Sequence, residues 1–290
     1  MNNSEITDPL FLETVEAIDS GDTEHLESLV TKHPRLIVDR LDHPVEGYFR
    51  NPYLLWFVAD NPIRIDKLPP NITEITSFLI TAVKRGAADS YQFQLDYTLG
   101  LVATGRIPQE CGVQIEMMDL LINEGAKPGG GLGALAHGNI AAAEYLIERG
   151  GTLTLPVAVG LARMDDVKRL VVTAKPEELL IALTAAAFYG KPDMITYLLS
   201  AGVNPNGYPK NNSGFHSHAT PLHQAVYSGS LDAVKLLVEA GADIDARDLV
   251  YDGTTIGWAQ YMQTEESTDE TQKKSFALIA DYLLERKQTS

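Results

Sequence analysis

Three histidines form the densest group of side chains that could do chemistry: His216, His218 and His223. Three imidazoles can hold Zn²⁺ or a similar metal ion and leave one coordination position open. Because His216 and His218 are two residues apart, an extended segment would point both to the same face. A small-ligand or metal site in the segment 205–223 is therefore one hypothesis. The alternative, which we favour, is that these imidazoles serve the structure or contact a partner.

Other motifs with a possible chemical role are weaker. The glycine-rich stretch 129–133 lacks the Gly-Lys-Ser/Thr ending of a phosphate-binding loop, and a helix that starts after a turn explains it better. Cys111 is the single cysteine, and no basic neighbour in the sequence would activate its thiol. The acidic pairs at 165–166 and 177–178 lie beside expected helix starts, where they complement the helix dipole. We therefore expect no enzyme activity and no cofactor.

Composition and charge narrow the class of protein. Of 290 residues, 39 are acidic and 23 are basic, which gives a net charge of −16, and 44% are hydrophobic. That apolar fraction predicts a folded chain, and the length predicts one or two domains. The net charge argues against nucleic acid and against an anionic membrane surface as partners. The polar start Met1–Pro9 and the lack of an apolar run of about 20 residues lead us to expect a cytoplasmic, reducing location.

One short phrase recurs along the chain: leucine-like residues, then a small or charged pair, then glycine. Good copies end at Gly125, Gly150, Gly202 and Gly241. The leucines that mark good and weaker copies are spaced by 25, 24, 28, 39 and 46 residues: Leu121, Leu146, Leu170, Leu198, Leu237 and Leu283. The varying period predicts a repeat architecture with inserted loops.

The segment 220–248 predicts the structure of one repeat. Thr220 can cap a short first helix with Pro221 at its first position, and Gly229 ends it. Four apolar residues then recur with the spacing of one helix face: Leu231, Val234, Leu237 and Val238. Gly241 can supply the left-handed residue that ends this second helix. The unit is thus a helix, a tight turn, a second helix and a loop.

This unit resembles an ankyrin repeat, through its Thr-Pro-Leu-His start, Gly229 and the phrase Leu-Leu-Val-Glu-Ala-Gly-Ala-Asp. The segment 187–206 is a second good match. The whole chain resembles irregular bacterial ankyrin-repeat proteins in the phrases at 69–75, 98–104, 216–223 and 252–259. The resemblance implies that His223 bonds to the backbone and holds the loop between repeats. Trp56 and Gly100 stand where the repeat pattern places that histidine, so the hydrogen bond should be missing there.

The resemblance also implies the fold class and the domain organisation. We expect an all-α protein, an ankyrin-type α-solenoid of about eight helix pairs with short β-hairpin fingers and inserted loops. It would form one solenoid over residues 1–290. Its expected parts are an N-terminal capping repeat at about 8–37, irregular repeats at about 51–127, abbreviated repeats at about 128–176, the best-matching repeats at about 177–249 and a C-terminal capping repeat at about 250–287.

The function that the resemblance implies is a non-catalytic protein–protein interaction scaffold. Such solenoids bind through a concave face and through their fingers. The residues before the glycine that separates the two helices should face that side, and aromatic side chains there are good anchors. The expected partner-binding residues are Tyr189, Tyr227, Tyr208, Phe215, His216, His218, His137 and Tyr261. We expect a protein partner, basic if charge steers it, and neither nucleic acid nor a membrane.

Overall fold

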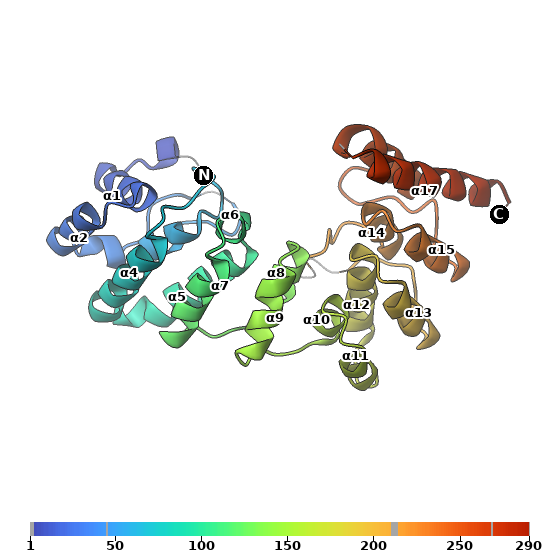
Figure 1. Ribbon diagram of the computed structural model, residues 1–290, viewed down its shortest axis with the longest axis horizontal. Coiled ribbons are helices and arrows are strands. Elements are labelled where there is room, and N and C mark those ends of the chain that lie inside the picture. Colours follow the sequence, from blue (N-terminus) through green and yellow to red (C-terminus); the bar gives the residue numbers. More distant parts are fainter. Residues whose placement is uncertain (1–2, 45, 210–213, 268, 290) are drawn as a thin grey trace. The chain divides into compact units, whose positions relative to one another are not determined.

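The computed structural model describes residues 3–44, 46–209, 214–267 and 269–289, with side chains to residue 288. The chain divides into two compact units, Met1–Thr152 (unit 1) and Leu153–Ser290 (unit 2). Each unit is described by itself, and the expectation of one solenoid over 1–290 stays a prediction. Within each unit, helices run side by side as antiparallel pairs (Figure 1).

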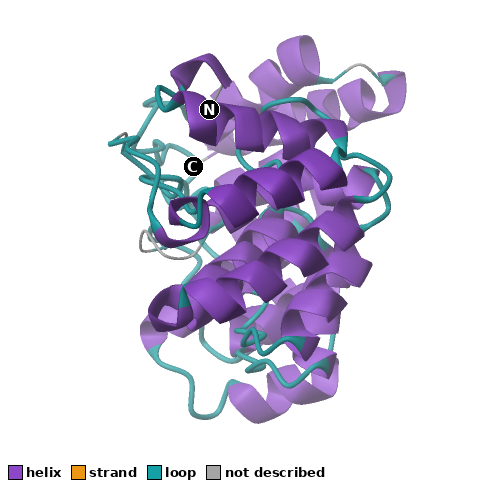
Figure 2. Cartoon of the chain, turned by 90° about the vertical axis from the view of Figure 1, so that its left-hand side faces the viewer, coloured by secondary structure: helices purple, strands orange, loops and turns teal. Residues whose placement is uncertain are grey.

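Unit 1 contains η1 (Asn3–Glu5), α1 (Pro9–Ser20), α2 (Thr23–Lys32), α3 (Arg35–Val38), η2 (Leu54–Ala59), α4 (Ile72–Gly86), α5 (Ala88–Thr104), α6 (Arg106–Glu110), α7 (Gln114–Asn123), α8 (Leu132–Ala136) and α9 (Ile140–Glu148). Unit 2 contains α10 (Leu155–Gly160), α11 (Met164–Leu170), α12 (Pro176–Phe188), α13 (Pro192–Ser200), α14 (Pro221–Tyr227), α15 (Leu231–Glu239), α16 (Thr255–Tyr261), the π-helical turn η3 (Met262–Glu266) and α17 (Glu270–Thr289). The described residues thus form helices and loops, which confirms the all-α expectation (Figure 2).

The helix boundaries follow local signals in the sequence. Asp8 accepts hydrogen bonds from the backbone N–H groups of Leu10 and Phe11 and so caps α1. Asp22 caps α2 in the same way, and Gly21 between the two helices has φ 78°. Such caps are visible in the sequence, because an aspartate stands directly before each helix.

The structure corrects the expectation that the fingers are β-hairpins. Among the described residues, the pairing is limited to one isolated antiparallel bridge between Arg247 and Thr254. In the described parts of 205–219, Pro205 and Pro209 lack the N–H that a ladder needs, and Gly207 has φ 123°. These segments are therefore loops.

The core of unit 1 is built around η2, whose six residues are all buried. The segment is a 3-10 helix, and Asp60, which follows it, has φ 43°. Trp56 stacks on Tyr97 of α5, with ring centroids 3.9 Å apart. Its indole Nε1 is buried without a hydrogen-bond partner in the described part of the chain.

A buried arginine ties η2 to α1. Arg64 donates from Nη2 to Asp19 at 2.6 Å and to the carbonyl of Phe57 at 3.1 Å, and its Nη1 lies 3.6 Å from Asp60. Burial raises the pKa of Asp60, although the neighbouring Arg64 guanidinium opposes this shift. The side chains of Arg64 and Asp60 are almost fully buried. Each charge is therefore stabilised by the opposite charge of the other side chain.

Unit 2 is organised around α12. Its buried face is formed largely by small side chains: Ala182, Ala185, Ala186 and Ala187. Small residues let neighbouring helices approach closely, and α12 packs against α10, α13 and α14. Phe188 is the last residue of α12, and Tyr189 follows it. Their aromatic rings lie where the loop 214–219 returns to α14.

Candidate functional site

His223 has a structural role that accounts for both of its ring nitrogens. It is fully buried in α14, and its Nε2–H donates to the carbonyl of Gly253 at 3.1 Å. Nδ1 therefore accepts from the hydroxyl of Thr220 at 2.8 Å. This confirms that the imidazole bonds to the backbone of the next loop. Thr220 does stand at the N-cap of α14, but its hydroxyl serves His223, so no side-chain cap forms.

The metal-site hypothesis receives no support from this arrangement. The described residues contain no group of three His, Cys, Asp or Glu side chains that could hold a metal ion. His216 was expected in an extended segment, but its φ is 25° and the chain turns at the next two residues. Nδ1 of His216 lies 3.1 Å from Oε1 of Gln224 and donates to it, so this nitrogen is also engaged. Lys210, Asn211 and Asn212 of the expected finger lie outside the described residues.

Phe215 was expected to contact a partner, and that expectation is wrong. Its side chain is completely buried, with ring centroids 5.2 Å from Phe188 and 6.3 Å from Tyr189. The amide of Gln224 donates to the carbonyls of Phe215 and His216 and holds the loop against α14. An apolar side chain in a loop thus becomes core because the loop folds back onto two helices.

Two of the expected aromatic anchors lie together over the ends of α12 and α14. Tyr227 stacks on Phe188, with ring centroids 5.5 Å apart and an angle of 18° between the ring planes. The centroid of the His216 ring lies 4.7 Å from that of Tyr227. Tyr227 is 39% exposed. Tyr189 is half-buried, and burial raises the pKa of its hydroxyl to about 12. Tyr227 therefore offers more free surface than Tyr189.

The half-buried ring of Trp258 in α16 continues this aromatic group. It lies 5.0 Å from His223 and 6.0 Å from both His216 and His218. Its indole Nε1–H donates to Asp248 at 3.0 Å. The structure therefore brings His216, His218 and Tyr227 to one aromatic surface beside Trp258.

Asp248 organises the loop that precedes α16. Its buried carboxylate accepts backbone N–H groups from Val250, Tyr251 and Gly253 at 3.0, 2.6 and 2.9 Å. Burial would raise its pKa, but these hydrogen bonds and the one from Trp258 together hold the pKa below its ordinary value. A charged acceptor with four donors fixes the loop firmly.

The sequence-based expectation missed a run of three consecutive exposed apolar residues in unit 2. Leu249, Val250 and Tyr251, here called the apolar tip, are 67%, 62% and 77% exposed. They occupy the turn that Asp248 holds. The sequence did contain a signal for this exposed group, because three apolar residues stand between Asp248 and Asp252-Gly253 in an expected loop. The ring of Tyr251 contacts that of His218, with centroids 5.8 Å apart.

The remaining expected residues are dispersed. Tyr261 is exposed at the end of α16, and its hydroxyl donates to Glu266 at 3.1 Å. Tyr208 is half-buried, and its hydroxyl donates to the carbonyl of Arg247 at 2.6 Å. His137 belongs to unit 1, where its Nδ1–H donates to the carbonyl of Gly133 at 2.8 Å. The tyrosines thus lie in the same unit as the apolar tip, whereas His137 does not.

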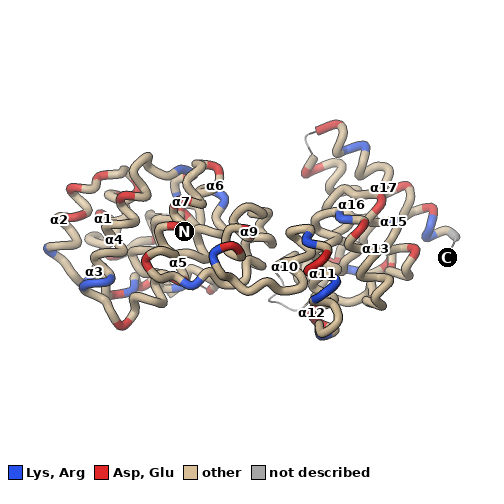
Figure 3. Tube along the Cα trace, turned by 60° about the horizontal axis from the view of Figure 1, so that its bottom comes forward, with Lys and Arg blue, Asp and Glu red and all other residues tan. Residues whose placement is uncertain are grey.

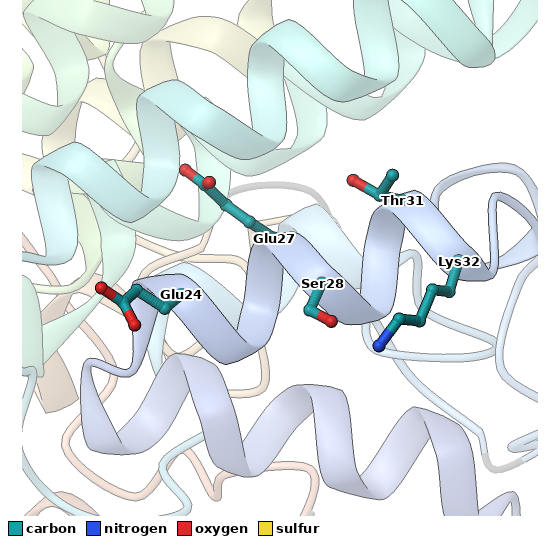
Figure 4. Close-up of a pocket in the computed structure, with 5 residues that line it drawn as sticks. All are labelled: Glu24, Glu27, Ser28, Thr31 and Lys32. Atoms are coloured by element: carbon teal, nitrogen blue, oxygen red, sulfur yellow. The ribbon is translucent and has the colours of Figure 1, made fainter.

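A groove of about 360 Å³ lies between the end of α14, the turn η3 and the first half of α17. Residues from all three elements line it, among them Tyr227, Met262, Glu266, Ser267, Thr271 and Phe276. A second hollow of about 350 Å³ is lined by α2 of unit 1 alone, through Glu24, Glu27, Ser28, Thr31 and Lys32 (Figure 4). Since one helix supplies that whole lining, it is an open helix face, and the groove of unit 2 is the better-built site.

Comparison with known proteins finds ankyrin repeats in part of the chain. The family model described as "Ankyrin repeats (3 copies)" matches residues 138–248. An ankyrin repeat-containing protein of Schizosaccharomyces pombe, P1E11.10, is 36% identical over 107 residues, which are 34% of this chain and 48% of that protein. The potassium channel GORK of Arabidopsis thaliana is 42% identical over 59 residues, 20% of this chain and 6% of the channel. The match thus spans less than half of either relative.

A solved structure, that of the human ASB11 ankyrin repeat domain, has a TM-score of 0.35 and 16% sequence identity to this chain. The alignment covers 73% of this chain and 97% of that domain. The family match places ankyrin repeats at residues 138–248 of this chain. Ankyrin repeats generally mediate protein–protein interaction, and proteins built from them are generally non-catalytic scaffolds. The relatives named above come from a yeast and a plant, so the likeness to bacterial proteins stays a prediction.

Proposed function

We propose that this chain is a protein-binding scaffold that holds its partner on one surface of unit 2, formed by the apolar tip, Tyr227 and Tyr261. The observation that carries the proposal is the exposure of three consecutive apolar side chains, Leu249–Tyr251, at the turn held by Asp248. Exposed side chains add little to the stability of their own unit, and clustered exposed apolar groups are typical of interaction sites.

The rigidity of the turn supports the same proposal. Asp248 accepts three backbone N–H groups and the Trp258 indole, and His223 binds the carbonyl of Gly253. A surface that is ordered before binding loses less conformational entropy when a partner docks. The loop therefore presents Leu249 and Tyr251 in one fixed arrangement.

The proposed mode of action is binding without a chemical step, on a protein partner with basic or mixed charge, in a cytoplasmic setting. The net charge of −16 supports a basic partner, and acidic residues are spread over both units (Figure 3). None of the helices in the described part of the chain is long and apolar enough to cross a bilayer. The single cysteine, Cys111, is exposed and unpaired, as a reducing compartment allows.

Affinity capture from native lysate with quantitative mass spectrometry tests the proposal. The variants are a Leu249→Ser/Tyr251→Ser double substitution and, as a matched control, Val172→Ser, which changes an apolar residue of unit 2 that is 81% exposed. Partners that the parent and the control recover equally should be depleted at least about fivefold by the double variant, since a contact of about 1 kcal/mol changes affinity by that factor. Equal recovery by all three chains would contradict the proposal.

A further inference from the structure

We propose that the groove beside Tyr227 receives a lysine or arginine side chain of the partner, with the cationic end of that side chain at Glu266. This inference rests on the proposed function, since the side chain belongs to the protein that docks on the apolar tip. It adds the chemistry of the partner: a peptide segment in which a basic residue stands next to an apolar one.

The shape and floor of the groove suit such a side chain. Its volume is about 360 Å³, and α14, η3 and α17 converge on it. Met262 and the buried ring of Phe276 supply apolar surface, and a Cβ placed on Gly229 would lie 3.6 Å from that ring. Lysine and arginine bury their methylene stems against apolar surface and keep the charged end in polar surroundings.

The charge at the groove favours a cation. Glu266 is the charged residue among those that line it. The segment 262–276 holds four carboxylates, Glu265, Glu266, Asp269 and Glu270, and two lysines, so its net charge is 2 − 4 = −2. Lys273 already pairs with Glu270 at 3.2 Å. Glu266 and the net negative charge of this segment therefore favour a basic side chain in the groove.

Glu266 is positioned by a hydrogen bond that still leaves acceptor capacity. Its Oε1 accepts the hydroxyl of Tyr261 at 3.1 Å. A carboxylate accepts several hydrogen bonds, so Oε2 can receive an ammonium or guanidinium group. Tyr227 of α14 also lines the groove, and its ring can cover an apolar neighbour of the basic residue.

A row of ring contacts links the groove to the apolar tip. The ring of Tyr251 lies 5.8 Å from that of His218, which lies 5.9 Å from that of His216. The ring of His216 lies 4.7 Å from that of Tyr227, which lines the groove. One partner segment can therefore place an apolar side chain against the tip and a basic one in the groove.

The probe for the test is a phage-displayed library of random dodecapeptides, selected on the full chain, followed by synthesis of the best binder. The selected sequences should contain Lys or Arg beside an aliphatic or aromatic residue. Glu266→Gln should weaken the binding of that peptide about fivefold, because an accessible charge-assisted contact contributes about 1 kcal/mol. Asp281→Asn, which removes a charge from α17 away from the groove, should change Kd less than about twofold.

A double-mutant cycle assigns the contact to one pair of groups. The basic residue of the peptide is replaced by neutral citrulline or norleucine, and both peptides are measured on the parent and on Glu266→Gln. The neutral peptide should bind the two chains equally, since the partner of Glu266 is gone. Additive losses, or a selection that returns uncharged peptides or no binder, would overturn the inference. Retained capture by the Leu249→Ser/Tyr251→Ser chain would instead overturn the proposed function, so the two failures are distinguishable.

Discussion

The indole N–H of Trp258 donates to the carboxylate of Asp248 across 3.0 Å, and this bond joins the loop of the apolar tip to helix α16. His223 reaches the same loop from α14 through the carbonyl of Gly253. Two neighbouring helix pairs thus hold one exposed turn. A repeat histidine and a buried aspartate together convert a loop into a defined binding element.

Replacement of Asp248 by alanine should destabilise unit 2 by about 2 to 3 kcal/mol, because it strands three backbone N–H groups and an indole N–H. Urea unfolding followed by circular dichroism measures the change. Asp281→Ala, on the exposed face of α17, is the control and should stay within about 0.5 kcal/mol of the parent. A loss no larger than that of the control would mean that Asp248 does not hold the turn.

Acidification should destabilise unit 2 through its histidines. Burial lowers the pKa of both His216 and His223 below the ordinary 6.5, so the folded state binds fewer protons than the unfolded state. Their contribution to stability is then complete above that value and is lost as pH falls through the lowered folded pKa.

Thermal melts at about pH 7.5 and 5.5 test this dependence. The Tm of the parent should fall more between the two than that of a His216→Gln/His223→Gln variant. His25→Gln, which changes an exposed histidine of unit 1, should behave like the parent. Parallel Tm shifts in the parent and the double variant would rule out the histidines as the cause.

Arg64→Met should destabilise unit 1 by about 3 to 5 kcal/mol, since it leaves Asp60 buried without its cation. Arg106→Met removes exposed ion pairs to Asp66 and Glu110 and should lower the stability of unit 1 far less than Arg64→Met does. Trp56 and Trp258 are the two tryptophans, one in each unit. Fluorescence unfolding in a Trp258→Phe background therefore reports unit 1, and equal midpoints for the two arginine variants would refute the buried-pair account.

Tyr189 and Tyr227 should separate stability from binding. Tyr189→Ala removes a half-buried ring and should cost about 2 kcal/mol of stability. Tyr227→Ala, which is more exposed, should cost about 1 kcal/mol and reduce partner capture. Denaturation and pull-down of each single variant measure the two effects. Reduced capture by Tyr189→Ala with unchanged stability would reverse these assignments.

The sequence predicted the repeating helices better than the binding surface. The helices at 221–227 and 231–239 follow from Pro221, Gly229 and the apolar spacing of α15, because these signals act within a few residues. Phe215 was misassigned because its burial depends on Phe188, which is 27 residues away. The apolar tip was missed because its exposure depends on the buried side chain of Asp248, which periodicity does not reveal.

Site-specific photo-crosslinking tests most directly whether the partner rests on the apolar tip. A benzoylphenylalanine placed at Val250 should give a covalent adduct with the captured partner on irradiation. The same group at Val172, which is also exposed in unit 2, should give none. Equal adducts from both positions, or partner capture with no adduct from position 250, would contradict the account.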